Sequence, residues 1–414
     1  MAKSSGCGTG SPKLNAHPSR PHPKIHMQIK SLKYSEFAGE GNDWSLEETE
    51  WDSVTLLVGR NASGKSRTLR VVNGLARLVS GLGPMIFTAG TYHVRFDDDG
   101  TCIEYSLVIQ DRKVVNEQFT RDGKVLLDRG VGGVGKIWAA KDEAHLDFQT
   151  PENELAVVAR RDSLQHGFFE ALHNWGRGVR FFQFGTEFGQ KTFGYILDKK
   201  DPLLPKNTEQ VIGAFREGVK LGAEKFTAAI LRDMNAVGYE LEEIGLQPPT
   251  GLIIEIQEIE PGQFTCLYVK ERALHTKTEQ TAMSQGMFRA LAIVIHLNFA
   301  AVSELPSCIL IDDIGEGLDF ERSCSLIEVT MAKAKEFSVQ LIMSTNDRFV
   351  MNKVPLEYWA VIHREGHTCK LYTYRNAKEI FDEFKFTGLN NFDFFASRFV
   401  ESRVQDHNAS DVKK

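Results

Sequence analysis

The feature that most constrains this chain is the segment 59–66, which reads Gly-Arg-Asn-Ala-Ser-Gly-Lys-Ser. It fits G-x-x-x-x-G-K-[S/T] at every fixed position, and it lies between a wholly apolar run, Val54–Val58, and a helical pattern over 66–80. In such a loop, backbone N–H groups surround phosphates at a helix N-terminus, whose dipole favours anions. Lys65 would reach the β- and γ-phosphates, and the Ser66 hydroxyl would hold Mg²⁺. The sequence thus predicts a nucleotide-binding loop made of Gly59, Arg60, Asn61, Ala62, Ser63, Gly64, Lys65 and Ser66.

Two carboxylates follow a second apolar run, about 250 residues downstream of this loop. The run 308–311 reads as a buried strand and ends at Asp312 and Asp313. One carboxylate can order a Mg²⁺-bound water, and the next can polarise the attacking water. The alternative is an ordinary acidic turn, but the upstream phosphate loop favours the metal site.

The segment 312–319, Asp-Asp-Ile-Gly-Glu-Gly-Leu-Asp, resembles the D-E-P-x-x-x-L-D block of ABC-type ATPases. In that resemblance Asp313 stands at the catalytic Glu position and Asp319 at the D-loop position. Upstream, Met-Ser-Gln-Gly-Met at 283–287 resembles the L-S-G-G-Q signature, keeping Ser284 and Gly286. Downstream, Asn346 occupies the place of the family's switch histidine.

The order of these motifs is similar to that of the SMC, RecF and OLD-like group of AAA-type ATP-binding proteins, over roughly residues 27–375. The resemblance implies an α/β P-loop NTPase fold, an ABC-type head with an antiparallel β subdomain and a helical lobe. It implies ATP and Mg²⁺ as ligands, with Asp313 and Asn346 as catalytic residues and Ser66 and Asp312 on the metal. Because the family's signature acts on a partner's nucleotide, it also implies that Ser284 and Gly286 act in trans, in a homodimer or higher oligomer.

Several positions depart from the family pattern. Asp313 is one methylene shorter than Glu, so hydrolysis would be slow or would need a partner. Asn346 can hydrogen-bond a γ-phosphate or a water but cannot carry a proton as His does. Gln183 is a candidate for the family's Q-loop glutamine, and a buried strand-end residue is the alternative. Tyr34 and Phe37 could stack on adenine, although aromatic side chains more often fill cores.

Patterning divides the chain into five parts. Residues 1–26 are expected to be a disordered tail. Residues 27–200 form a first ATPase lobe, in which alternating runs between 91 and 149 indicate the antiparallel β subdomain. Residues 201–279 form a helical lobe, and 280–375 carry the signature, the acidic motif and the switch segment. The Phe-rich tail 376–414 is helical, either packed on its own domain or used to dock an effector.

The composition and net charge of the chain help to choose between possible functions. The 49 basic and 55 acidic side chains give a net charge of -6, so DNA is a possible partner that charge does not indicate. The sequence contains no run of 18 apolar residues, so it predicts no membrane-spanning helix. The cysteines form no C-x-x-C pair. The sequence favours a cytoplasmic ATPase switch that controls an effector protein, which by resemblance suits bacterial or phage defence. The alternatives are a DNA-repair or maintenance ATPase of RecF or SMC type and a transporter's ATPase subunit, the latter opposed by the degenerate signature.

Overall fold

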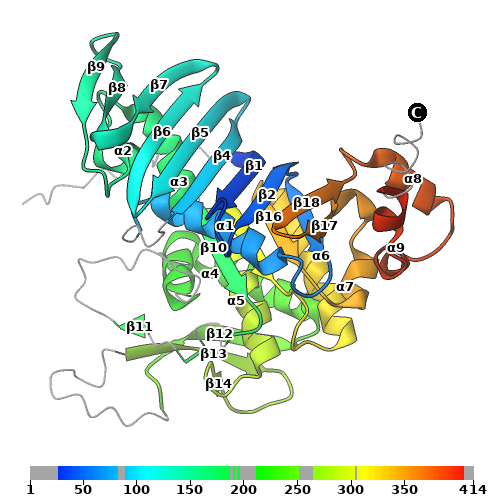
Figure 1. Cartoon of the computed structure of the whole chain (residues 1–414). Helices are drawn as coiled ribbons and strands as arrows, with labels where there is room; N and C mark the ends of the chain where they lie inside the picture. Colours follow the sequence, from blue (N-terminus) through cyan, green and yellow to red (C-terminus); the bar gives the residue numbers. More distant parts are fainter. Residues whose placement is uncertain are drawn as a thin grey trace, which may run out of the picture.

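The computed structural model describes residues 27–82, 89–186, 190–191, 194–195, 211–250, 264–303 and 305–404. Their dominant feature is one sheet of 14 strands in the order β10-β15-β16-β3-β17-β18-β2-β1-β4-β5-β6-β7-β8-β9. Figure 1 shows this sheet running from β9 at one tip of the molecule to the parallel strands that lie among the helices. The predicted tail 1–26 lies outside the described residues.

The parallel half of the sheet contains five short apolar strands. These are β10 (Val179–Gln183), β15 (Cys308–Asp312), β16 (Gln340–Ser344), β3 (Val54–Val58) and β17 (Trp359–Glu365). Each pairs in parallel with the next in that order. Strands buried on both faces read as continuous apolar runs rather than as alternations, as these do.

Helices cover both faces of these strands. One face packs against α1 (Lys65–Val79) and α3 (Glu170–Gly178), where Leu57, Leu310 and Ile342 meet the helices. The opposite face packs against α4 (Val211–Val237), α5 (Gln285–Val302), α6 (Phe320–Glu336) and α7 (Arg348–Lys353). This is the layered α/β arrangement of a P-loop NTPase, with the phosphate-loop strand β3 separated from β15 by β16. The fold class expected from the sequence is confirmed.

The antiparallel strands continue the same sheet. They are β1 (Gln28–Glu36), β2 (Trp44–Glu50), β4 (Ala89–Asp98), β5 (Thr101–Gln110), β6 (Lys113–Arg121), β7 (Lys124–Arg129), β8 (Val134–Ala139) and β9 (Ala144–Gln149). Strand β18 (Thr368–Thr373) joins the two halves, antiparallel to β17 and parallel to β2. The predicted β subdomain is therefore an extension of the sheet that contains the parallel strands.

A buried ion pair anchors the far end of this extension. Arg129 Nη1 lies 3.1 Å from Glu117 Oε2, and both side chains are fully buried. Arg129 also donates to the carbonyl oxygens of Thr150 and Pro151, and Glu117 accepts the N–H of Ala156 at the start of α2 (Ala156–Ala159). Removing either partner would leave an uncompensated buried charge.

The described part of the range 201–279 is only partly helical. It holds α4, which is interrupted at Ala223 (φ 46°, ψ -134°), and then a small separate sheet. That sheet contains β11 (Gly194–Tyr195), β12 (Leu241–Gln247), β13 (Phe264–Glu271) and β14 (Thr278–Glu279), with β13 in the middle. Before α3 the chain forms a turn in which Asp162 Oδ1 accepts the N–H groups of Leu164 and Gln165, and then a 3₁₀ turn at Gly167–Phe169.

The Phe-rich tail forms two short helices beside the parallel strands. These are α8 (Lys378–Lys385) and α9 (Asn391–Ala396), and they lie at the opposite end of the molecule from β8 and β9 (Figure 1). Phe381, Phe384 and Phe394 are buried and pack on one another, whereas Phe386 is 91% exposed. Most of the tail's aromatic surface thus packs on its own domain.

Among the described helices, α5 alone is long and apolar enough to cross a membrane by length and composition. Of its 18-residue window, 83% is buried inside the structure, where it packs against α4 and the sheet. A buried core helix passes this test as readily as a membrane span does.

Candidate nucleotide-binding site

The predicted site residues meet where three neighbouring parallel strands end. Strand β3 leads into the phosphate loop, β15 ends at Asp312, and β16 ends at Ser344, two residues before Asn346. Since β16 lies between β3 and β15, Asn346 stands between the phosphate loop and the acidic pair. This is the carboxyl edge of the strands, where open α/β sheets bind their ligands.

The phosphate loop is closely packed from below, which explains its glycines. A Cβ on Gly59 would lie 2.4 Å from Ile362 Cγ2, and one on Gly64 would lie 3.1 Å from Cys369 Sγ. Gly64 also has a φ of 110°, a region that residues with a Cβ rarely adopt. Side chains of β17 and β18 therefore pack directly against the backbone of the loop. The N–H groups of the loop lie at the N-terminus of α1.

Lys65 lies against the loop itself. Its Nζ donates to the carbonyl oxygens of Gly59 (2.6 Å) and Arg60 (3.2 Å) and to Asn346 Oδ1 (3.0 Å). Burial lowers the pKa of Lys65, and the charges of Asp313 and Asp312 oppose that shift. The ammonium group is thus held where anionic phosphates would replace the loop carbonyls as its partners.

The donor set around Asp312 fits Mg²⁺. Ser66 Oγ donates to Asp312 Oδ1 at 2.9 Å, and Ser344 Oγ donates to the same oxygen at 2.7 Å. The described residues contain no cluster of three or more His, Cys, Asp or Glu that could hold a metal alone. One hydroxyl and one carboxylate match a Mg²⁺ ion whose other ligands are phosphate oxygens and water.

Asp313 and Asn346 are joined by a hydrogen bond at the carboxyl ends of β15 and β16. Asn346 Nδ2 donates to Asp313 Oδ1 at 2.9 Å, and the N–H of Asp313 donates to Ser344 Oγ at 2.9 Å. Asp313 has a positive φ of 57°, an uncommon conformation for a residue with a side chain. Burial raises the pKa of Asp313, as do the charges of Asp312 and Glu316, while Lys65 lowers it. The Asp313 carboxylate is therefore more basic than an ordinary Asp, which suits a group that accepts a hydrogen bond from water.

One cavity of about 440 Å³ lies beside the phosphate loop. It is lined by a set that includes Lys65, Ser66, Asp313 and Asn346 together with Trp44, Arg67, Arg70 and Arg364. None of these last four residues was predicted from the sequence. Arg67 lies 4.6 Å from the centroid of the Trp44 ring and is held by Glu36, so this wall combines a cation with an aromatic group.

The signature residues do not line this cavity. Ser284 caps α5, with Oγ accepting the N–H of Met287 at 3.2 Å. Gly286 packs under the loop after β15, where a Cβ would lie 2.7 Å from the carbonyl oxygen of Gly317. Asp319 caps α6 by accepting the N–H of Arg322. The structure therefore brings the phosphate loop, the acidic pair and Asn346 together, and places Ser284, Gly286 and Asp319 in a second group.

Three further sequence predictions concern residues around the site. Gln183 ends β10 in register with Asp312, next to the metal carboxylate. Tyr34 is buried and packs against Trp44 and Tyr92, with its hydroxyl donating to Glu36, which favours the core-packing alternative. Phe37 is half-buried and does not line the described cavity. Ser344 was missed, although its position at the end of an apolar strand was a usable signal.

No protein-family model matches this sequence, and no curated protein sequence matches it. Among solved structures, the chain is similar to an SMC head bound to the C-winged helix domain of ScpA, at 15% identity and a TM-score of 0.48, covering 83% of this chain and 97% of that one. It is also similar to the SMC head domain from Thermotoga maritima, at 12% identity and a TM-score of 0.43, covering 84% and 98%. A third is the Smc head with an extended coiled coil from Pyrococcus furiosus, bound to the C-terminal domain of ScpA, at 14% and 0.46, covering 87% and 100%. Identities and TM-scores of this size assign no role to any residue.

Proposed function

We propose that this chain binds Mg-ATP and hydrolyses it slowly, and that ATP holds two copies in a closed dimer. The observation that carries the proposal is the hydrogen-bonded path from Lys65 through Asn346 to Asp313, across the ends of three adjacent strands. A buried cation, an amide and a carboxylate of raised pKa lie in one line beside a phosphate loop. Binding alone would need the loop and Lys65, whereas the added carboxylate suits hydrolysis.

Each side chain has a separate task in this proposal. Lys65 and the loop N–H groups bind the β- and γ-phosphates. Ser66 and Asp312 would hold Mg²⁺, which would supply positive charge beside the phosphate oxygens. Asp313 accepts a hydrogen bond from the attacking water, and Asn346 fixes the orientation of that carboxylate. Because Asp is shorter than Glu, the water is held less closely, and we expect slow turnover.

The dimer follows from the second group of residues. Ser284 and the first turn of α5 offer a hydroxyl and N–H groups, yet they stand outside the chain's own nucleotide cavity. In a closed dimer they would bind the γ-phosphate held by the other copy, as donors at a helix N-terminus do. Hydrolysis would remove the bridging phosphate and release the pair.

We further propose that the dimer controls an effector protein in the cytoplasm. The net charge of -6 favours a protein partner over a DNA backbone as the main target. An effector whose activity depends on whether two heads are joined would respond directly to the nucleotide state.

Light scattering and phosphate release test the proposal together. The wild type, Lys65→Ala, Asp313→Asn and the control Asp128→Asn on the distant strand β7 are measured with and without Mg-ATP. We expect ATP-dependent dimers in the wild type and control, more persistent dimers in Asp313→Asn, and no ATP binding in Lys65→Ala. Wild-type turnover by Asp313→Asn would remove the catalytic role of that residue. An unchanged mass in every protein that binds ATP would refute the dimer.

A further inference from the structure

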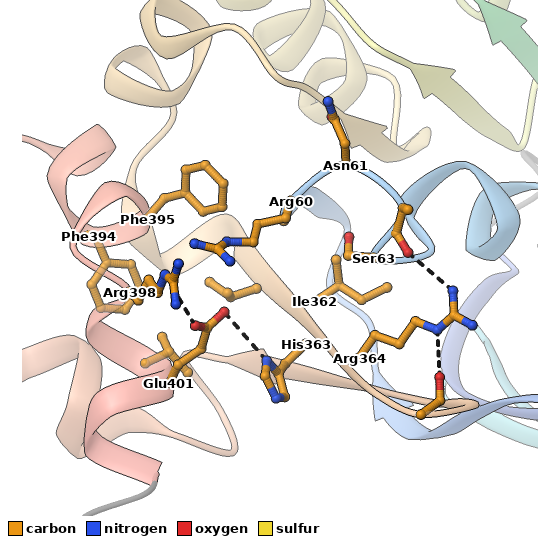
Figure 2. A pocket seen from close by; sticks show the side chains of 15 residues that line it. Arg60, Asn61, Ser63, Ile362, His363, Arg364, Phe394, Phe395, Arg398 and Glu401 are labelled. Carbon is orange, nitrogen blue, oxygen red and sulfur yellow. Dashed lines mark hydrogen bonds and ion pairs between the residues drawn. The ribbon is translucent and has the colours of Figure 1, made fainter.

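A second cavity lies on the other side of the phosphate loop. It measures about 530 Å³ and is enclosed by the loop, the end of β17 and the chain around α9. Its apolar wall is formed by Ile362, Phe394 and Val400, and its polar side chains include Arg60, Arg398 and Glu401. Figure 2 shows Arg60 reaching away from the loop toward Phe395 and Arg398. The volume is that of a small-molecule site.

This cavity is distinct from the nucleotide site but shares a wall with it. Lys65, Ser66, Asp313 and Asn346 do not line it. Arg60, Asn61, Ala62 and Arg364 line both cavities. Ser63 lines this cavity and not the nucleotide cavity, so the two sides of the loop face two different cavities.

One buried polar group in this wall has no partner. Ser63 is only 7% exposed, and its Oγ has no hydrogen-bond partner in the structure. A buried hydroxyl without a partner carries a free-energy cost that a bound acceptor would remove. This orphaned hydroxyl indicates that the cavity is shaped for a ligand with a hydrogen-bonding group.

The charges around the cavity favour an anion. The guanidinium of Arg60 forms no hydrogen bond or ion pair with any described residue. Glu401 Oε2 lies 3.9 Å from Arg398 Nε, and its Oε1 lies 3.5 Å from Nδ1 of His363, whose Nε2 lies 3.2 Å from Glu365. The guanidinium groups of Arg60 and Arg398 lie on the same side of the cavity as Glu401, whereas that of Arg364 points away and donates to the carbonyl oxygens of Ala62 and Gly366 (Figure 2).

We propose that this cavity binds a small planar apolar molecule that carries a single anionic group. The anion would be bound by Arg60, Arg398 and the hydroxyl of Ser63, and the planar body would pack on Ile362 and the rings of Phe394 and Phe395. Arginine suits this role because its planar group binds carboxylates and also stacks on flat rings.

Occupancy of this cavity is coupled to occupancy of the nucleotide site. A ligand on one side of Arg60–Ala62 restrains the same loop that binds phosphates on the other side, and such coupling is reciprocal. This part rests on the proposed function, whereas binding to the cavity does not. The two can therefore fail separately.

Calorimetry with 2-naphthoate as the probe tests the binding. Mg-ADP is present in one series, and Lys65→Ala replaces the wild type in another, so that the phosphate loop cannot be the probe's site. We expect a Kd below about 1 mM for the wild type and for Lys65→Ala. Neutral 2-naphthalenemethanol and acetate, which each supply half of the chemistry, should bind at least about tenfold more weakly.

Variants place the probe in the cavity. Arg398→Gln and Phe395→Ala should each weaken 2-naphthoate binding at least about fivefold, whereas Arg403→Gln should leave it unchanged. Arg403 is the matched control because it stands on the same C-terminal segment, over Phe399, and does not line the cavity. Circular dichroism confirms that each variant is folded. Equal affinity in Arg398→Gln and wild type, or no binding to the wild type, would overturn the site.

The coupling has its own measurement. Saturating Mg-ATP should change the Kd of 2-naphthoate at least about threefold, and saturating 2-naphthoate should change the Kd of ATP by the same factor. Binding of both ligands with unchanged affinities would refute the coupling and leave both sites standing. Binding of 2-naphthoate by a protein that binds no ATP would refute the proposed function alone.

Discussion

Asn346 Nδ2 donates a hydrogen bond of 2.9 Å to Asp313 Oδ1, which joins the end of β16 to the end of β15. The same amide accepts a hydrogen bond from Lys65 Nζ at 3.0 Å through its oxygen. An amide can donate and accept at once without carrying a charge. Asn346 therefore links the Lys65 ammonium group to the Asp313 carboxylate, and it does so without adding to the charge of the site.

This relationship predicts that the two functional groups of Asn346 matter separately. Asn346→Ala should lower kcat about 10- to 100-fold with little change in ATP affinity, because the orientation of Asp313 is lost while Lys65 keeps two loop carbonyls. Asn346→Asp should lower kcat further and move the acidic limb of the pH profile upward, since a second carboxylate raises the pKa of Asp313. Phosphate release from pH 5 to 9 measures both effects. Asn116→Ala on β6 is the control, and equal pH profiles for Asn346→Asp and wild type would contradict the linkage.

Local patterns were sufficient for the parallel core and the phosphate loop. The apolar run Val54–Val58 and the helical pattern over 66–80 depend on residues close together in the chain, and the structure reproduces both to within a residue, as β3 and α1. The contact between Ser66 and Asp312 joins residues 246 apart, and it could be predicted only because a known motif order supplied it. The pairing of β18 with β2, which joins the β subdomain to the parallel strands, had no local signal because it depends on two distant segments.

Side-chain direction was the part of the site that the sequence could not supply. Residues 59–66 were predicted as one nucleotide-binding set, yet the Ser63 side chain lines the opposite cavity. A loop of this kind alternates its side chains between two spaces according to individual backbone angles, such as the positive φ of Ala62 and Gly64. Spacing alone does not report those angles.

Ser344 is expected to tune the metal site although it is not itself a ligand. Its hydroxyl donates to Asp312 Oδ1 and accepts the N–H of Asp313, so Ser344→Ala frees one carboxylate and leaves a buried N–H without a partner. We expect Mg²⁺ to bind about 10- to 100-fold more weakly when ATP is saturating. Mg²⁺ titration of turnover measures this. Ser323→Ala, which removes another buried hydroxyl near the same loop, is the control. Equal Mg²⁺ dependence in Ser344→Ala and wild type would show that Asp312 needs no such support.

Gly286 is expected to separate dimer formation from nucleotide binding. A Cβ at this position would lie 2.7 Å from the carbonyl oxygen of Gly317 and 2.8 Å from Leu318 Cδ2, so the signature turn and the loop before Asp319 must move apart. Gly286→Ala should keep the ATP affinity within about threefold and lose the ATP-dependent dimer. Gly167→Ala, at a glycine with open space around it, is the matched control. A Gly286→Ala protein that dimerises normally with ATP would exclude this turn from the interface.

His296 predicts how stability depends on pH. It is fully buried on α5 with neither ring nitrogen hydrogen-bonded, and burial together with the charge of Arg180 holds its pKa well below the usual 6.5. The unfolded chain binds a proton there below pH 6.5 that the folded chain excludes, so stability is complete above that pH and is lost as the pH falls. His173, with a pKa lowered to about 4, acts in the same direction.

His296→Leu should raise Tm by about 2–5 °C at pH 7.5, because it removes two unpaired polar atoms. It should also reduce the fall in Tm between pH 7.5 and pH 5.5, without abolishing it. The exposed His93→Leu is the control for thermal unfolding at the two pH values. A fall in Tm as large in His296→Leu as in the wild type would assign the acid sensitivity to other groups.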